Sequence, residues 1–288
     1  MNTALIIILV ILGSTFGSFS GATIWRLRAR DLKSQKKLDK AASRELNQIS
    51  FLTKLKLSND RSHCLNCKHQ LSTLDLIPIV SWLYLRGRCR YCNHPIGKFE
   101  LYMEVLTALY FVLSYIYWPV QLDSSMEITK FVLWLVIGVG LMIIAGYDSK
   151  WSEIPSIIMY AVIFLSLIWT IMSLSASNFQ LSSIYSLVGA IAVLSGFYLL
   201  IYLVSKGKWI GFGDIELGLA LALLLMDWRL AFINLFVANF LGTLIVLPGL
   251  IAKKIKKSQS VPFGPLYIAG FFVAFLWGNE LFIAVFPK

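Results

Sequence analysis

Charged residues are scarce in this chain. Only 14% of its 288 residues are Asp, Glu, Lys or Arg, whereas 58% are hydrophobic, and the mean hydropathy is +0.73. A water-soluble helical protein of this length needs a more polar surface, so that class is excluded. Several apolar runs are long enough to cross a bilayer as helices, and they are continuous rather than alternating. The sequence therefore predicts membrane-spanning α-helices and not a β-barrel.

No Lys or Arg precedes the first apolar run, residues 3–24. A cleavable secretory signal carries its positive charge before the apolar run, but here the basic residues begin after it, at Arg26. This order predicts a retained first helix with its N-terminus outside and its other end in the cytoplasm. We expect seven further spans, 101–118, 129–146, 155–174, 182–204, 215–226, 230–251 and 263–286, of which 215–226 is short.

The distribution of basic residues supports this topology. The segments expected in the cytoplasm hold 23 of the 26 Lys and Arg residues, namely 26–98, 147–154, 205–213 and 252–261. Positive charge accumulates on the cytoplasmic side of membrane proteins, which explains the basic residues better than nucleic-acid binding does, so no nucleic acid is expected. The Lys-rich part, 28–61, is either an amphipathic helix on anionic membrane lipids or a solvated linker.

Cysteine is absent outside a short region. The four cysteines form two CxxC pairs, Cys64 with Cys67 and Cys89 with Cys92, which 21 residues separate. Each pair can hold one side of a tetrahedral ion, and four thiolates complete a structural Zn²⁺ site. Disulfides are the alternative, which a cytosolic location disfavours. The three histidines lie in the same region and are interpreted as bystanders, with His63 and His94 as the alternative ligands.

Two aspartates lie at the cytoplasmic boundary of the predicted membrane region. Asp214 follows Gly211-Phe212-Gly213 at the start of the short span, and Asp148 lies at the end of the third span, at the same expected depth. An acidic residue in this position is costly, which favours a functional role, and glycines allow a backbone or substrate to approach closely. Paired carboxylates suit peptide hydrolysis, because one takes a proton from water while the other polarises the carbonyl. The structural alternative is a loop acid and a helix N-terminal acid.

The order of these motifs resembles the type 4 prepilin leader peptidases, polytopic aspartic proteases of the GxGD class. The similarity covers nearly the whole chain and includes Gly17-Ser18-Phe19, the CxxC pairs, Asp75-Leu76-Ile77-Pro78, Arg86-Gly87-Arg88-Cys89, Glu104, Asp148 with Ile154-Pro155, Gly211-Phe212-Gly213-Asp214 and Pro262-Phe263-Gly264-Pro265. The resemblance implies that Asp148 and Asp214 are the catalytic pair, supported by Gly211 and Gly213. It also implies cleavage of leaders from prepilin or pseudopilin precursors at the cytoplasmic face of the bacterial cytoplasmic membrane. Many members then methylate the new N-terminus with S-adenosylmethionine.

The sequence thus predicts an all-α polytopic membrane protein with about eight transmembrane helices and a small cytoplasmic zinc-ribbon-like insertion between helices 1 and 2. The expected parts are a first helix over 1–25, a basic segment with the four-cysteine module over 26–98, and a membrane-embedded peptidase core over 99–288. Two other functions stay open. One is a transporter or channel in which the aspartates bind a cation or relay protons. The other is a zinc-ribbon scaffold that recruits a pilus assembly partner.

Overall fold

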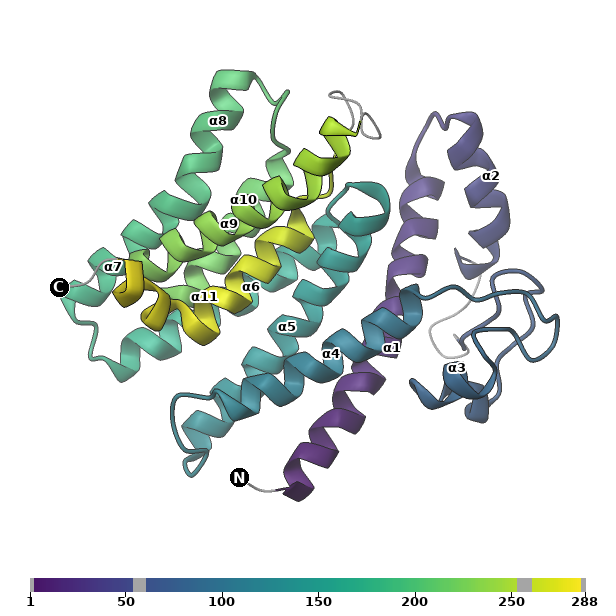
Figure 1. Ribbon diagram of the computed structural model, residues 1–288, viewed down its shortest axis with the longest axis horizontal. Coiled ribbons are helices and arrows are strands. Elements are labelled where there is room, and N and C mark those ends of the chain that lie inside the picture. Colours follow the sequence, from purple (N-terminus) through teal and green to yellow (C-terminus); the bar gives the residue numbers. More distant parts are fainter. Residues whose placement is uncertain (1–2, 54–60, 253–260, 286–288) are drawn as a thin grey trace. The chain divides into compact units, whose positions relative to one another are not determined.

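A computed structural model describes residues 3–53, 61–252 and 261–285 of the chain (Figure 1). The described residues contain helices and two isolated β-bridges but no strand, in agreement with the predicted all-α class. Contacts divide the chain into two compact units, Met1–Trp118 and Pro119–Lys288. The second predicted span therefore belongs to the same unit as the first.

Unit 1 is built on two long helices that pack through small residues. Helix α1 covers Thr3–Ser34 and helix α4 covers Phe99–Ile116. A Cβ atom on Gly13 would lie 2.7 Å from the Cα of Ala108, and one on Gly17 would lie 2.5 Å from the Cα of Glu104. Only glycine permits so close an approach, and close approach of backbones is what stabilises helix pairs in lipid.

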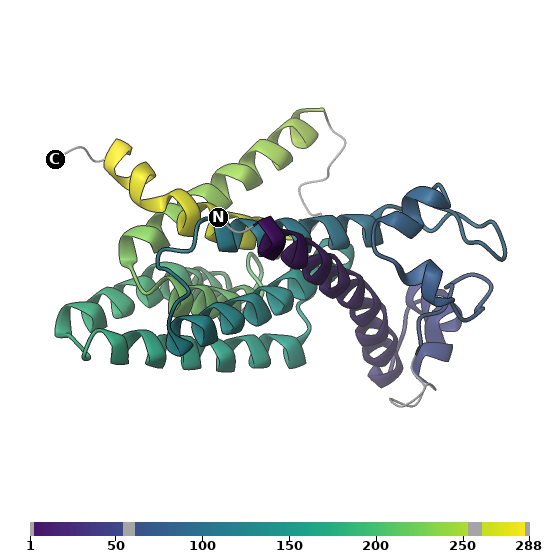
Figure 2. The same ribbon diagram turned by 90° about the horizontal axis from the view of Figure 1, so that it is seen from below.

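Helix α1 continues ten residues beyond the end of its apolar run and carries a second helix there. Helix α2 (Lys40–Ile49) begins at Asp39, whose side chain accepts a hydrogen bond from the Ala42 N–H (2.7 Å). Its Ile49 forms a buried cluster with Ala29 and Leu32 of α1, and Figure 2 shows α2 alongside this part of α1. The apolar face of the Lys-rich segment is thus covered by protein, at least up to the 3₁₀ turn η1 (Ser50–Thr53), while residues 54–60 lie outside the described part.

The four-cysteine module fills the connection from α2 to α4. It contains two short elements, the 3₁₀ turn η3 (Thr73–Leu76) and the helix α3 (Val80–Tyr84). The two β-bridges, His63 with Gln70 and Arg88 with Pro95, also lie in it. The described part of the module is therefore mostly turns.

Unit 2 contains the remaining helices. They are α5 (Ser125–Trp151), α6 (Ser156–Ala176), α7 (Leu181–Ile191), the π-helical turn η4 (Ala192–Gly196), α8 (Phe197–Ser205), α9 (Phe212–Leu225), α10 (Trp228–Ile251) and α11 (Gly264–Val285). Helices α7 and α8 continue each other through η4, so residues Leu181–Ser205 form one long helical stretch. The basic loop predicted over 252–261 falls almost entirely outside the described residues.

Within residues 3–53, 61–252 and 261–285, seven helices are long and apolar enough to cross a membrane: α1, α4, α5, α6, the α7–α8 stretch, α10 and α11. They correspond to seven of the eight predicted spans. The eighth is α9, whose 14 residues extend only about 21 Å. Nine of its residues are buried, and Trp169 and Thr170 of α6 donate hydrogen bonds to its last carbonyls (3.1 and 2.7 Å). Helix α9 is therefore the central helix of unit 2, and it begins with the predicted acidic site.

Candidate active site and metal centre

Asp148 lies in the last turn of α5 with only 5% of its surface exposed. Its Oδ2 atom accepts a hydrogen bond of 2.8 Å from the backbone N–H of Gly264, the first residue of α11. The first N–H groups of a helix have no partner inside the helix and readily bind an anion. A Cβ atom on Gly264 would lie 2.9 Å from Oδ2, so glycine is required for this contact.

Asp214 is the third residue of α9, and its side chain turns back to the start of the helix. Its Oδ2 atom accepts a hydrogen bond of 3.2 Å from the backbone N–H of Gly211. A Cβ atom on Gly213 would lie 3.1 Å from the Cβ of Ile154, in the loop that follows α5. Gly213 therefore lets the first turn of α9 approach the chain segment that carries Asp148.

The structure brings the two predicted aspartates together from α5 and α9. Their carboxyl groups lie within range of a charge interaction. Two carboxyl groups that share a poorly solvated site do not ionise together easily, so they tend to hold one proton between them. Asp227 follows the opposite end of α9, where it pairs with Arg229 (2.7 Å), and is not part of this site.

Two tyrosines at this site were not predicted from the sequence. Tyr198 of α8 and Tyr267 of α11 are buried and lie within range of a charge interaction with Asp214. The Tyr198 hydroxyl accepts a hydrogen bond from Asn239 (3.0 Å), and the Tyr267 hydroxyl donates one to the carbonyl of Leu194 (2.9 Å) in the π-helical turn η4. In an apolar run such tyrosines are indistinguishable from core residues. Turns of π-helix are frequent at functional sites, and η4 lies next to this candidate site through its hydrogen bond with Tyr267.

The four cysteines form a compact cluster in unit 1. Their Sγ atoms all lie within 4.8 Å of one another, and those of Cys64 and Cys92 are 3.8 Å apart. A tetrahedral ion with Zn–S bonds of about 2.3 Å has sulfur atoms about 3.8 Å apart. All four thiols are free of disulfides. The cluster can therefore bind a metal ion, and its donor set and size fit zinc.

The two CxxC pairs adopt the same backbone turn. The N–H of Lys68 donates to the Cys64 carbonyl (2.9 Å), and the N–H of Asn93 donates to the Cys89 carbonyl (3.0 Å). Lys68 and Asn93 both have a positive φ, 59° and 55°. In the second turn the backbone N–H of His94 lowers the pKa of the Cys92 thiol to about 6, which favours the thiolate that a metal needs.

The histidines lie outside this cluster. Among the described residues, the group able to hold a metal consists of the four cysteines without a histidine. The Nδ1 atom of His63 instead contacts the Arg61 carbonyl (2.7 Å), and the His69 ring packs on Tyr91 with 3.7 Å between ring centroids.

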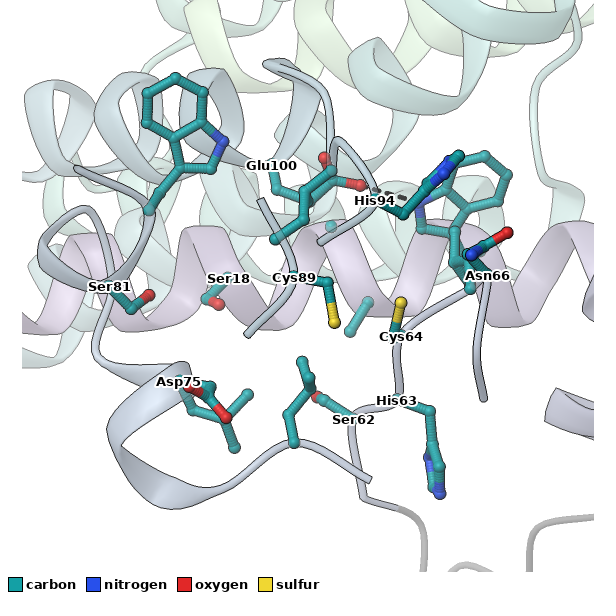
Figure 3. Close-up of a pocket in the computed structure, with 18 of the residues that line it drawn as sticks. Ser18, Ser62, His63, Cys64, Asn66, Asp75, Ser81, Cys89, His94 and Glu100 are labelled. Carbon is teal, nitrogen blue, oxygen red and sulfur yellow. Dashed lines mark hydrogen bonds between the residues drawn. The ribbon is translucent and has the colours of Figure 1, made fainter. Parts of the chain in front are cut away.

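A pocket of about 350 Å³ lies beside the cysteine module, against α1 and α4 of the same unit. Figure 3 shows His94, Cys64, Cys89 and Glu100 around it. The indole of Trp25 donates a hydrogen bond to Oε1 of Glu100 (3.1 Å). The other carboxyl oxygen of Glu100 is buried and has no hydrogen-bond partner within the part of the chain that the structure describes. The pocket therefore presents a carboxylate oxygen that a ligand with a donor or a positive charge could satisfy.

Taken together, these features define an integral membrane protein of apolar helices, with a pair of aspartates in one unit and a four-cysteine module in the other. Residues 11–118 match the bacterial peptidase A24 N-terminal domain, and residues 128–247 match the type IV leader peptidase family. The chain belongs to the type IV prepilin leader peptidase family.

Individual relatives agree with this assignment. A protein of Escherichia coli O78:H11 (strain H10407 / ETEC) named type 4 prepilin-like proteins leader peptide-processing enzyme is 32% identical over 214 residues, which are 73% of this chain and 72% of the relative. A prepilin leader peptidase/N-methyltransferase of Stutzerimonas stutzeri is 27% identical over 282 residues, 96% of this chain and 92% of the relative. A prepilin leader peptidase/N-methyltransferase of Bacillus subtilis (strain 168) is 28% identical over 226 residues, which are 77% of this chain and 83% of the relative. No solved structure matches the chain.

Proposed function

We propose that this protein is a membrane aspartic endopeptidase that removes the leader peptide from type IV prepilin-like or pseudopilin precursors. The observation that carries the proposal is the pair of a buried Asp148 and a half-buried Asp214, whose carboxyl groups lie within range of a charge interaction, in a chain that belongs to the prepilin leader peptidase family. A transporter would use the same acids for cations, and a scaffold would not need them, but family membership favours neither.

The hydrogen bonds of the two aspartates suggest how they divide the reaction. Each carboxyl group has its Oδ2 atom held by a backbone N–H, from Gly264 at Asp148 and from Gly211 at Asp214. Among the described residues, the Oδ1 atoms have no such backbone donor and are free to take part in the proton transfers. The ionised partner takes a proton from water, the resulting hydroxide adds to the scissile carbonyl, and the protonated partner donates to the carbonyl oxygen. Collapse of this intermediate breaks the peptide bond and returns a proton to the leaving amine.

We place the pair near the cytoplasmic face of the bacterial cytoplasmic membrane, with the N-terminus outside. The distribution of Lys and Arg supports this orientation, because the loops after α5 and before α9 belong to the basic side. The positive-inside rule applies best to short loops such as these two.

The decisive experiment follows processing of a co-expressed precursor by gel shift. Asp148→Asn and Asp214→Asn should each reduce cleavage by at least about 10³-fold while the protein still inserts, since removing one member of a catalytic unit costs nearly as much as removing all. Asp227→Asn is the matched control, because this acid lies beyond the opposite end of α9 and pairs with Arg229. Cleavage that persists in either of the first two variants would refute the catalytic pair.

We further propose that the four cysteines hold a structural Zn²⁺ ion. Four thiolates leave no open coordination position, so the ion would supply folding energy and no chemistry at the peptide bond. The sulfur spacing and the two matching turns around Cys64 and Cys89 support this assignment.

We also propose a second activity, N-methylation of the new N-terminus, and the pocket in unit 1 supports this proposal. Several relatives carry N-methyltransferase in their names. S-adenosylmethionine carries a sulfonium cation, which suits the unpaired carboxylate oxygen of Glu100 beside the indole of Trp25. The pocket volume of about 350 Å³ falls in the range of small-molecule sites.

This second proposal can fail without affecting the first. Purified protein should bind S-adenosylmethionine in calorimetry, and Glu100→Gln should weaken binding by about tenfold while precursor cleavage stays unchanged. Unchanged binding in this variant, or no binding by the wild type, would contradict the assignment of the pocket.

A further inference from the structure

The segment 71–85 of the cysteine module exposes an unusual amount of apolar surface. Leu74, Val80 and Leu83 are 64%, 59% and 59% exposed, and Tyr84 is 77% exposed. We name these four side chains the apolar patch. The segment has one charged residue, Asp75, whose side chain is 3% exposed and paired with Arg90 (2.6 Å). Four large, exposed apolar side chains on one segment without exposed charge are unusual for a protein face that meets water.

The position of this segment along the membrane helices is set by Glu104 of α4. The backbone N–H of Ile79, the residue before α3, donates a hydrogen bond of 2.7 Å to Oε2 of Glu104. Glu104 in turn packs on Gly17 of α1, where a Cβ atom would be 2.5 Å from its Cα. Gly17 precedes the end of the apolar run of α1, at Ile24, by seven residues, or about 10 Å of helix. Ile79 therefore lies level with a part of α1 that is inside the bilayer.

The backbone of the segment is arranged for such an environment. In lipid, N–H and C=O groups must find partners within the protein. The N–H groups of Ser81, Leu83 and Leu85 bond to carbonyls of the same segment at 3.0, 3.0 and 2.9 Å. Ile79 has a φ of 61°, which is strained for a β-branched residue, and the bond to Glu104 holds it there. Glu104 thus satisfies the N–H that this strained turn would otherwise leave unpaired.

The residues that follow the segment suit the membrane surface. Arg86 and Arg88 come directly after it, and both are exposed. Basic side chains beside an inserted apolar segment can bind lipid phosphates, as they do next to spanning helices.

We propose that segment 71–85 is inserted into the bilayer leaflet on the side of the cysteine module, with the apolar patch in contact with lipid acyl chains. The module is then anchored to the membrane by three elements: α1, α4 and this inserted segment. The other candidates for covering the patch are unit 2 of the same chain and the apolar helix of a precursor.

The test uses photo-crosslinking in the full-length protein reconstituted into phospholipid vesicles. Benzoylphenylalanine replaces Tyr84, which it resembles in size, and the mass of the crosslinked peptide identifies the adduct. A second variant carries it at Val80, in case the first does not fold. Tyr102 of α4 is the matched lipid-facing control, since it is an aromatic residue 56% exposed on a spanning helix. Ala41, exposed on α2, is the water-facing control.

Phospholipid adducts at Tyr84 and Val80 should form within about threefold of the yield at Tyr102, and at least about tenfold above the yield at Ala41. Adducts with peptides of 119–288 would overturn the proposal in favour of a contact with unit 2. Adducts with an added precursor in place of lipid would overturn it in favour of a substrate surface. A yield no higher than at Ala41 would show that the patch faces water.

Discussion

The cysteine cluster and the aspartate pair are assembled in opposite ways. Each half of the cluster is made by a short turn. In these turns the backbone N–H of Cys64 donates a hydrogen bond to the carbonyl of His69, and the N–H of Cys89 donates one to the carbonyl of His94. The aspartate pair joins residues 66 positions apart, and the N–H that binds Asp148 comes from Gly264, a further 50 positions along the chain. The cluster therefore depends on local turns, whereas the aspartate pair depends on how the three helices α5, α9 and α11 pack. Substitutions in one of the two sites should therefore change its property, metal content or cleavage rate, with much less effect on the other site.

The first substitution tests the metal content of the cluster. Cys64→Ser should reduce bound zinc from about one ion per chain to less than about a tenth of that, since three thiolates hold the ion much more weakly. Precursor cleavage should fall far less than in Asp148→Asn, because the contacts of the aspartates described here lie within unit 2. Metal analysis and the gel-shift assay measure the two effects.

His63→Ala is the matched control for this prediction, as His63 lies beside Cys64 but outside the cluster. It should retain its zinc. Wild-type protein without metal, or loss of zinc from His63→Ala as well, would contradict a site made of four cysteines alone.

The next prediction concerns the hydrogen bond from Gly264 to Asp148, which joins residues far apart in the sequence. In Gly264→Ala the new Cβ would lie 2.9 Å from Oδ2 and 3.3 Å from Cγ of Asp148, so the carboxyl group must move and its hydrogen bond is lost. Displacing a catalytic group by this much should reduce the rate of cleavage by about 10². Zinc content should not change. Gly242→Ala is the control, because its Cβ would meet only a methyl group of Leu266 at an ordinary 3.5 Å.

A smaller effect on the rate of cleavage is expected from substitutions of Gly211 and Gly213, and it should differ between these two glycines. In Gly213→Ala the new Cβ would lie 3.1 Å from the Cβ and Cδ1 of Ile154, so the rate of cleavage should fall several-fold, by about 5 to 10. In Gly211→Ala it would lie 3.5 Å from Asp214 Oδ2 at a φ of −77°, which any residue adopts, and the rate should change less than about twofold.

A double variant sharpens the contrast between the glycines. Adding Ile154→Ala to Gly213→Ala removes the atoms that the new methyl group would meet and should restore part of the rate. If Gly211→Ala is the more damaging substitution, the glycine at that position serves the substrate rather than the fold.

The sequence predicts those features that depend on composition or local spacing. The apolar runs predict eight spans, and seven of them correspond to described helices long enough to cross a membrane. The CxxC spacing predicts the sulfur cluster around Cys64 and Cys89. The distribution of Lys and Arg predicts that Asp148 and Asp214 share one boundary, and the structure places their carboxyl groups together.

The features that escaped prediction depend on packing. Tyr198 and Tyr267 come within range of a charge interaction with Asp214 because α8 and α11 pack beside α9. The periodicity of an apolar run does not report which residue faces which neighbour. The helix α1 continues to Ser34 through a charged sequence because Ile49 and its neighbours cover it. The amphipathic pattern of 28–61 indicates an apolar face but does not say whether lipid or protein covers it.

The smallest expected effect comes from removing the ion pair between α2 and α1. Glu45 of α2 pairs with Arg28 of α1 at 3.0 Å, with side chains 24% and 9% exposed. Glu45→Gln should destabilise the docked α2 by about 1 kcal/mol, so hydrogen exchange of its amides should accelerate by about fivefold. Arg44→Gln, on the exposed side of α2, is the control and should leave exchange unchanged. If neither variant accelerates exchange, the apolar cluster of Ala29, Leu32 and Ile49 alone holds α2, and the ion pair contributes nothing measurable to it.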